Sequence, residues 1–272
     1  MKAGFYQFNP VFGNKKKNIT SVANALKGID VDLLVLPEFF ATGYQFTSME
    51  EVGYLAETIP DGETTEALAS LSKKYGMYMV AGLAERFDKH YYNSAVLTGP
   101  EGFVGLYRKT HLFFEEKLWF TPGNTGFNVF QTGIGPVGIM ICFDWLFPES
   151  MRTLALQGAQ VIAHPANLVL PHCPSAMPIR CLENKVYAIT ANRTGREQRK
   201  EGSCLEFIGK SQIVAPDSTI IAKAPKKWTS LMIADLKIDT ALNKSINQYN
   251  DLFKDRRPEM YQVLVEQEKN GP

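Results

Sequence analysis

The sequence predicts an α/β fold in which helices cover sheets, and three observations lead to this prediction. Short apolar runs typical of strands alternate with segments of helical periodicity along nearly the whole chain. No Pro/Gly/Ser-rich linker divides the 272 residues, and no segment repeats at a fixed period. Hydrophobic residues make up 45% of the chain and charged residues 21%, which is enough apolar material for a sizeable core. We therefore expect one domain spanning 1–272, in which a polar tail at 243–272 packs on the surface or on a partner subunit.

The strands are expected where apolar or β-branched residues run between turn residues. The segment 33–36 is wholly apolar and so reads as a strand buried on both faces, and Gly-Pro pairs at 99–100 and 135–136 mark turns between neighbouring strands. The expected strands are 2–8, 33–36, 77–83, 92–97, 103–109, 137–141, 161–164, 186–191, 210–214, 220–224 and 230–235.

The helices are expected from their apolar faces and end signals. At 15–27, Ile19, Val22 and Leu26 form one face, and the segment 63–75 lies between the turn residues Gly62 and Gly76. Further helices are expected at 148–157, where a proline opens the first turn, and at 178–186, with short ones after residue 239.

Charge and composition exclude several classes of partner. The chain has 29 basic and 28 acidic side chains, so no net field attracts nucleic acid or anionic lipid. No apolar run approaches the 18 residues of a membrane-spanning helix, and the start of the chain has the pattern of a strand rather than of a leader peptide. The four cysteines lack short paired spacings, which indicates reduced thiols in a cytoplasmic protein.

Three reactive side chains follow expected strands at similar positions. Glu38 comes after the apolar strand at 33–36, Lys109 ends the strand at 103–109, and Cys142 follows the strand at 137–141. Each alone is more often structural than catalytic, because strand ends commonly carry surface charges and free cysteines are often only buried. Together they place a carboxylate, an ammonium and a thiol at the strand ends where α/β proteins form their sites.

The motifs around these residues resemble those of the nitrilase superfamily of carbon–nitrogen hydrolases. The chain carries L-P-E-F-F at 36–40, Y-R-K-T-H-L-F at 107–113 and G-I-M-I-C-F-D-W-L-F-P-E at 138–149, in the family's order and spacing. The likeness continues through F-T-P-G at 120–123, H-P-A-N at 164–167 and the tail around 250–261, and so covers essentially the whole chain. The resemblance implies a four-layer α-β-β-α sandwich that pairs into a homodimer.

The resemblance also assigns roles to individual residues. It implies that Glu38 is the general base and acid, Lys109 the electrostatic stabiliser of an oxyanion, and Cys142 the nucleophile, with its thiol pKa lowered by the nearby ammonium. A second glutamate follows the lysine motif in the family; Glu115 and Glu116 compete for this role, and the distance to the F-T-P-G turn favours Glu116.

The substrate-binding residues are expected among aromatic side chains and polar groups near the cysteine. We expect Phe143, Tyr44, Trp145 and Asn167 to bind substrate, and the Phe143 backbone N–H to donate to the oxyanion. Phe39, Phe40, Phe113 and Phe114 are expected to complete a tight aromatic pocket.

The expected function is therefore hydrolysis of a small amide to a carboxylic acid and ammonia, with no metal or organic cofactor. Nitriles and N-carbamoyl compounds remain open as substrates, as does an inactive binding or scaffolding role for the fold. A Cys–His hydrolase using His111 or His164 would leave the Glu and Lys motifs without a purpose. A zinc site at His164, His172, Cys173 and Cys181 fits no compact ligand spacing.

Overall fold

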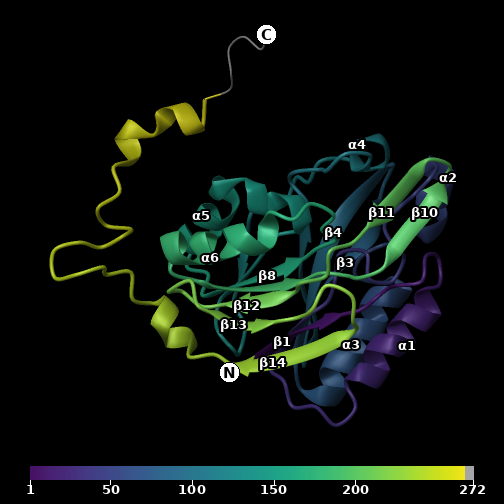
Figure 1. The fold of residues 1–272 in the computed structure, drawn as a ribbon, viewed down its shortest axis with the longest axis horizontal. Helices are drawn as coiled ribbons and strands as arrows, with labels where there is room; N and C mark the ends of the chain where they lie inside the picture. The colour runs from purple at the N-terminus through teal and green to yellow at the C-terminus, as the bar shows by residue number, and fades with distance from the viewer. Residues whose placement is uncertain (267–272) are drawn as a thin grey trace.

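A computed structural model describes residues 1–266 of the chain, and its two six-stranded sheets lie face to face (Figure 1). The first sheet has the order β14-β1-β2-β3-β4-β5 and the second β13-β12-β9-β8-β7-β6. The first sheet consists of β14 (Ser230–Asp235), β1 (Lys2–Gln7), β2 (Leu33–Val35), β3 (Tyr78–Phe87), β4 (His90–Gly99) and β5 (Gly102–Arg108). The second consists of β13 (Ile220–Lys223), β12 (Gln212–Val214), β9 (Tyr187–Ala191), β8 (Val161–Pro165), β7 (Val137–Ile139) and β6 (Val129–Phe130).

The helices form the two outer layers of the molecule. Helices α1 (Lys15–Ala25) and α3 (Glu63–Tyr75) cover the first sheet, and α5 (Pro148–Leu156) and α6 (Cys173–Asn184) cover the second (Figure 1). Strand β2 shows how one strand serves two layers, because its side chains alternate between faces. Leu34 packs with α1 and α3, whereas Leu33 and Val35 join the core between the sheets. The α-β-β-α sandwich expected from the sequence is confirmed.

The expected strands are all present, with ends that shift by a few residues, and both sheets are mixed. Strands β1, β2 and β3 run parallel, as do β7, β8 and β9, while their outer neighbours pair antiparallel. The parallel strands at the centre of each sheet matter for function, because their carboxyl ends lie at one edge. The strand before the cysteine is shorter than predicted, since Cys142–Leu146 forms a 3₁₀ turn.

Helix α6 corrects the prediction of a helix at 178–186. It begins at Cys173, where Pro174 occupies the first turn, and Pro178 lies inside it. An interior proline leaves the carbonyl four residues earlier without its helical donor. Here the Gln212 side-chain amide donates to the Pro174 carbonyl at 3.0 Å, so the orphaned acceptor is satisfied. The helix ends at Asn184 because Lys185 turns into the left-handed region.

Two short helices, the two-residue strand β6 and one hairpin were missing from the sequence analysis. Helices α2 (Met49–Leu55) and α4 (Glu116–Trp119) are short, and the hairpin of β10 (Arg196–Lys200) and β11 (Ser203–Glu206) is too polar to show the apolar alternation of a strand. Charge pairing holds this hairpin to the body: buried Arg193 pairs with Glu197, and Arg199 pairs with Glu51 at 2.6 Å.

The segment after residue 242 leaves the sandwich next to α5 and α6 (yellow in Figure 1). Lys244 anchors it by donating to the backbone carbonyls of Asn184 and Lys185 at 3.0 and 2.8 Å. The guanidinium of Arg152 lies over the ring of Phe253, with 5.4 Å between the guanidinium carbon and the ring centroid. The expected tail extends to residue 272, and its last residues, 267–272, lie outside the described residues. No helix within 1–266 is both long and apolar enough to cross a bilayer.

Candidate active site

Glu38 occupies the position directly beyond the central strand β2. Its side chain is fully buried, and its backbone passes so close to β3 that a side-chain carbon on Gly82 would lie 2.5 Å from the Glu38 Cα atom. Only glycine fits at position 82 without displacing this loop. The next residue, Phe39, has a φ of 49°, which turns the chain sharply away after the carboxylate.

Lys109 follows the last residue of β5 and is also fully buried. Its backbone N–H donates to the Asn93 carbonyl on β4, and its own carbonyl accepts from Gly123 N–H, each at 2.8 Å. A side-chain carbon on Gly123 would lie 2.0 Å from the Arg108 carbonyl oxygen, so the F-T-P-G turn needs glycine to press against the lysine backbone. The lysine is therefore held from both sides.

Cys142 is the first residue of the 3₁₀ turn after β7, with φ at 41°. This left-handed backbone conformation is uncommon for residues other than Gly, Asn and Asp. It is typical of a nucleophile placed on a sharp turn. Asp144 fixes the turn: its buried carboxylate accepts from Ile141 N–H at 2.9 Å and from the Tyr107 hydroxyl at 2.8 Å.

Two carboxylates, Glu38 from the loop after β2 and Glu116 from the first turn of α4, contact the lysine. Lys109 Nζ lies 2.7 Å from Glu38 Oε1 and 2.8 Å from both carboxylate oxygens of Glu116. The Asn93 side-chain amide joins the cluster by donating to Glu38 Oε1 at 2.7 Å and, more weakly, to Glu116 Oε2 at 3.4 Å. The structure thus brings Glu38, Lys109 and Glu116 into one hydrogen-bonded group at the strand ends.

The two neighbouring glutamates have different environments. Glu116 is buried and also accepts from the Tyr44 hydroxyl at 2.7 Å and from Phe113 N–H at 3.2 Å. Glu115 instead pairs with Lys200 of the β10–β11 hairpin at 3.0 Å, with 28% of its side chain exposed. Geometry places Glu116, and not Glu115, in the cluster.

Burial and charge set the protonation of the cluster. Burial raises the pKa of Glu38 to about 7, with the Lys109 ammonium opposing this and Glu116 adding to it. Burial alone would lower the pKa of Lys109, but the Glu116 and Glu38 carboxylates outweigh it and raise the lysine pKa, so the ammonium stays charged.

The pKa of the Cys142 thiol is raised, whereas the sequence analysis expected the nearby ammonium to lower it. Burial raises the Cys142 pKa well above its ordinary value, the Glu38 carboxylate raises it further, and Lys109 opposes both without overcoming them. The thiol is therefore protonated at rest and needs a base to become a nucleophile. Asn167, which lines the same pocket as Cys142, donates to the Glu38 backbone carbonyl and so connects the two parts of the site.

A pocket of about 180 Å³ opens at Cys142, and its wall is almost entirely apolar. Its described lining consists of Phe113, Cys142, Phe143, Trp145, Leu146, Asn167, Leu168, Val169, Leu170 and His172. Phe143, Trp145 and Asn167, which the sequence analysis proposed as substrate-binding residues, line this pocket together with Cys142. Asn167 also donates to the Glu38 carbonyl at 2.8 Å, which ties the segment after β8 to the glutamate loop.

Several other aromatic residues do not line this pocket, contrary to expectation. Phe39 and Phe40 are fully buried in two separate apolar clusters, because the turn after Glu38 directs them into the protein. Phe114 is 67% exposed. Tyr44 uses its hydroxyl on Glu116, and its pKa is raised by burial and by that carboxylate, so it remains a hydrogen-bond donor.

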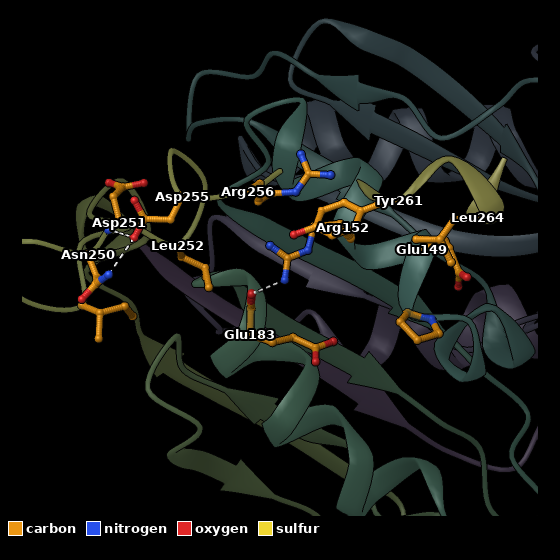
Figure 2. Close-up of a pocket in the computed structure, with 12 residues that line it drawn as sticks. Glu149, Arg152, Glu183, Asn250, Asp251, Leu252, Asp255, Arg256, Tyr261 and Leu264 are labelled. Carbon is orange, nitrogen blue, oxygen red and sulfur yellow. Dashed lines mark hydrogen bonds between the residues drawn. The ribbon is translucent and has the colours of Figure 1, made fainter. Parts of the chain in front are cut away.

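A larger cavity lies elsewhere. About 610 Å³ opens between α5, α6 and the C-terminal segment, where Arg152 donates to the Glu183 carbonyl at 2.6 Å (Figure 2). Its lining includes Arg256, Tyr261 and Leu264 but none of the clustered residues around Lys109. The size of a cavity therefore does not identify the active site. The buried charged cluster of Glu38, Lys109 and Glu116 identifies it instead.

The histidine alternatives have other hydrogen-bond partners. His164 Nε2 faces the Cys142 backbone carbonyl at 2.9 Å, so it is not the base of a Cys–His pair. His111 Nδ1 lies 2.8 Å from Asp144 Oδ1, and its ring stacks on Phe147 with centroids 3.6 Å apart. Within 1–266, no three His, Cys, Asp or Glu side chains converge to hold a metal ion, so His164, His172, Cys173 and Cys181 do not form the zinc site considered above.

Two residues of the site were missed in the sequence analysis. Asn93 lies inside β4, where an amide reads as an ordinary strand residue, and Asp144 was considered only as part of a motif. The one signal in the sequence was the place of Asn93 within the expected strand 92–97, since an amide buried in a sheet needs hydrogen-bond partners.

Comparisons with known proteins agree with this geometry. A family model described as carbon-nitrogen hydrolase matches residues 2–242. A protein of Pyrococcus abyssi named nitrilase is 49% identical over 264 residues, covering 96% of this chain and 99% of that protein. An N-carbamoylputrescine amidase of Solanum lycopersicum is 31% identical, covering 89% of this chain and 86% of that protein.

Solved structures show the same fold. A carbon-nitrogen hydrolase of Helicobacter pylori G27 superposes with a TM-score of 0.88 and 27% identity, covering 98% of each chain. An amidase of Nesterenkonia superposes with a TM-score of 0.78 and 23% identity, over 97% of this chain and 96% of that one. The α-β-β-α arrangement is thus shared over nearly the full length.

Proposed function

Because this chain belongs to the carbon-nitrogen hydrolase family, we propose that it hydrolyses small uncharged amides to a carboxylic acid and ammonia through a thioester on Cys142. The observation that carries the proposal is the state of the Glu38 carboxylate. One oxygen, Oε1, is held by Lys109 and Asn93, whereas Oε2 is buried with no hydrogen-bond partner within residues 1–266. A buried free oxygen on a carboxylate with a pKa of about 7 is suited to accept and return a proton.

In the first half of the reaction, Glu38 Oε2 takes the proton of the Cys142 thiol as sulfur bonds to the amide carbon. The carbonyl electron pair moves to oxygen, and the Lys109 ammonium and the Phe143 N–H stabilise the resulting oxyanion. When the pair returns, the C–N bond breaks, Glu38 gives its proton to nitrogen, and ammonia leaves.

In the second half, a water molecule attacks the thioester carbon and Glu38 takes its proton. Collapse of the second tetrahedral intermediate breaks the C–S bond, and the proton on Glu38 returns to sulfur. One amide and one water thus give one acid and one ammonia, and the enzyme returns to its starting state. Glu116 keeps Lys109 charged and in place through its 2.8 Å contacts.

The apolar pocket supports an uncharged acyl group. Its described lining contains no carboxylate, lysine or arginine, so a charged substrate tail would lose hydration without gaining an ion-pair partner. This disfavours a cationic amine of the kind that the name N-carbamoylputrescine amidase indicates for the tomato relative. Nitriles are the second candidate class, supported by the name of the Pyrococcus abyssi relative.

Ammonia release from matched substrates tests the proposal. The panel pairs a short aliphatic amide and an aromatic amide with the corresponding nitriles and with an N-carbamoyl amine, and Cys142→Ala is the control. We expect turnover of at least one uncharged amide, none by the variant, and little with the N-carbamoyl amine. Turnover of nitriles alone would replace the amide proposal by the nitrile one, and silence on all substrates would contradict both.

We further propose that a second copy of the chain covers α5, α6 and the C-terminal segment. Apolar side chains are exposed there: Ile179 and Leu182 on α6, and Met260, Val263 and Leu264 in the C-terminal segment. Exposed apolar groups gathered on one face favour association. Light scattering should give twice the monomer mass, and Ile179→Glu should reduce it; a monomeric wild-type protein would contradict the dimer.

A further inference from the structure

His164 is a fully buried histidine at the end of β8, and both of its ring nitrogens have partners. Nε2 lies 2.9 Å from the Cys142 carbonyl oxygen and Nδ1 lies 3.0 Å from the Thr190 hydroxyl. A carbonyl oxygen only accepts hydrogen bonds, so Nε2 carries the proton, and Nδ1 accepts from Thr190. The two contacts therefore select one tautomer of the ring.

The Cys142 carbonyl belongs to the same peptide group as the Phe143 N–H. A trans peptide is planar, so its N–H and C=O point in opposite directions, and fixing one fixes the other. Phe143 N–H has no hydrogen-bond acceptor within residues 1–266. Phe143 and Cys142 both line the pocket, so the peptide group that joins them borders it.

We propose that His164 is a positioning residue that orients and polarises the Cys142–Phe143 peptide so that its N–H stabilises the oxyanion. The inference rests on the proposed function and adds a residue to it. A hydrogen bond to the carbonyl oxygen draws electron density from the peptide and strengthens its N–H as a donor. It also holds the Cys142 backbone at its φ of 41°, a conformation that needs support from its surroundings.

Burial keeps the ring in the state that the role requires. It lowers the pKa of His164 to about 4, with the bond to Cys142 opposing this and the Lys109 charge adding to it. The imidazole is therefore neutral at neutral pH, and its single N–H is committed to the carbonyl. The lone pair on Nδ1 is committed to Thr190, so neither nitrogen is free to act as a base toward the thiol.

Two variants separate the hydrogen bond from the volume of the ring. His164→Leu fills much of the space but donates nothing, and His164→Gln keeps an N–H donor near the position of Nε2. We expect His164→Leu to lower kcat roughly 10- to 100-fold, less than the loss of a whole oxyanion donor, and His164→Gln to recover most of it. KM should change by less than about threefold, because the interaction strengthens in the transition state.

A second readout distinguishes this role from general support of the loop. Methyl methanethiosulfonate captures a thiol by forming an S–S bond and releasing methanesulfinate, without an oxyanion on a carbonyl carbon. Peptide mapping at Cys142 gives the rate of capture at this thiol, separate from the exposed Cys204. We expect His164→Leu to slow amide turnover but to change capture by less than about threefold, since no oxyanion forms.

The outcomes are separable from failure of the proposed function. If the wild-type protein turns over no amide or nitrile, the proposed function fails first. If the wild type is active and His164→Leu is equally active, or if turnover and thiol capture fall in parallel, the role of His164 is overturned. Circular dichroism checks folding; should the leucine variant not fold, His164→Asn, whose amide is too short to reach Cys142, takes its place with the same expectations.

Discussion

Lys109 is held by Glu116 through both oxygens of the carboxylate, each 2.8 Å from the ammonium nitrogen. The same lysine lies 2.7 Å from Glu38, so one cation is shared by two buried acids. An isolated buried charge is unfavourable, so the ammonium of Lys109 needs the carboxylate of Glu116 as its partner. The carboxylate of Glu38 can then gain and lose a proton next to a permanent positive charge. The proposed chemistry depends on this division between a fixed ion pair and a titrating carboxylate.

The first prediction concerns the two adjacent glutamates. Glu116→Gln removes the charge that holds Lys109, and we expect kcat to fall by roughly 10²-fold, within the range for a misplaced catalytic group. Glu115→Gln is the matched control, because Glu115 pairs with Lys200 of the β10–β11 hairpin and not with Lys109 within residues 1–266. Steady-state ammonia release measures both. Equal losses in the two variants, or a larger loss in Glu115→Gln, would contradict the assignment.

The second prediction concerns Lys109. Lys109→Ala should reduce kcat by at least about 10²- to 10³-fold, because an oxyanion donor is lost. It should also destabilise the protein by about 3–5 kcal/mol, since two buried carboxylates lose their cation. Urea unfolding and ammonia release measure the two effects, with Lys200→Ala as a surface control. A variant with near wild-type turnover would exclude the stabilising role.

The third prediction concerns pH. Glu38 must be ionised to accept the thiol proton, and its pKa is raised to about 7, mainly by burial. We expect kcat/KM to rise with pH and to level off above about 7, which the profile of the wild-type enzyme tests. An acid limb near pH 4.5, the ordinary value of the group, would contradict the buried environment.

The same raised pKa has a consequence for stability. Between the ordinary value of 4.5 and about 7, the folded protein holds a proton that the unfolded chain has released. The free energy of unfolding contributed by Glu38 therefore falls as pH rises through this window. Glu38→Gln should flatten this slope in urea unfolding, and an unchanged slope would show that Glu38 does not titrate there.

The fourth prediction concerns Gly82. A methyl group there would lie 2.5 Å from the Glu38 Cα atom, so Gly82→Ala should displace the carboxylate and lower kcat at least about tenfold. Gly133→Ala, whose added carbon meets only the Tyr78 hydroxyl at 3.2 Å, is the matched control. If both variants retain full activity, the close approach of β3 does not position Glu38.

The sequence predicted the strands because each is a short apolar run between turn residues, and it predicted three site residues because they follow such runs. Helix α6 was predicted wrongly because Pro178 was taken as its start, and only the tertiary contact of Gln212 explains an interior proline. Phe39 and Phe40 were expected in the pocket because they follow Glu38 in the sequence. The turn directs both side chains into the protein interior, and the sequence does not show this direction.

The hydrogen-bond network was the least predictable part. Asn93 comes from β4 and Glu116 from the first turn of α4, and no local pattern shows that this amide will bond to Glu116 or that this carboxylate will meet Lys109 in space. The raised pKa of Cys142 likewise depends on burial and on the Glu38 carboxylate, and the sequence analysis, which considered only the opposing Lys109 ammonium, predicted the opposite direction.

The central claim is that the acyl group passes through the sulfur of Cys142, and mass spectrometry of the rapidly quenched enzyme tests it most directly. With an amide that the enzyme turns over, the account predicts a mass increase equal to the substrate minus ammonia, on the peptide that contains Cys142. The adduct should be absent from Cys142→Ala. Ammonia release with no adduct at Cys142, or with the acyl group on Cys173, Cys181 or Cys204, would contradict the account.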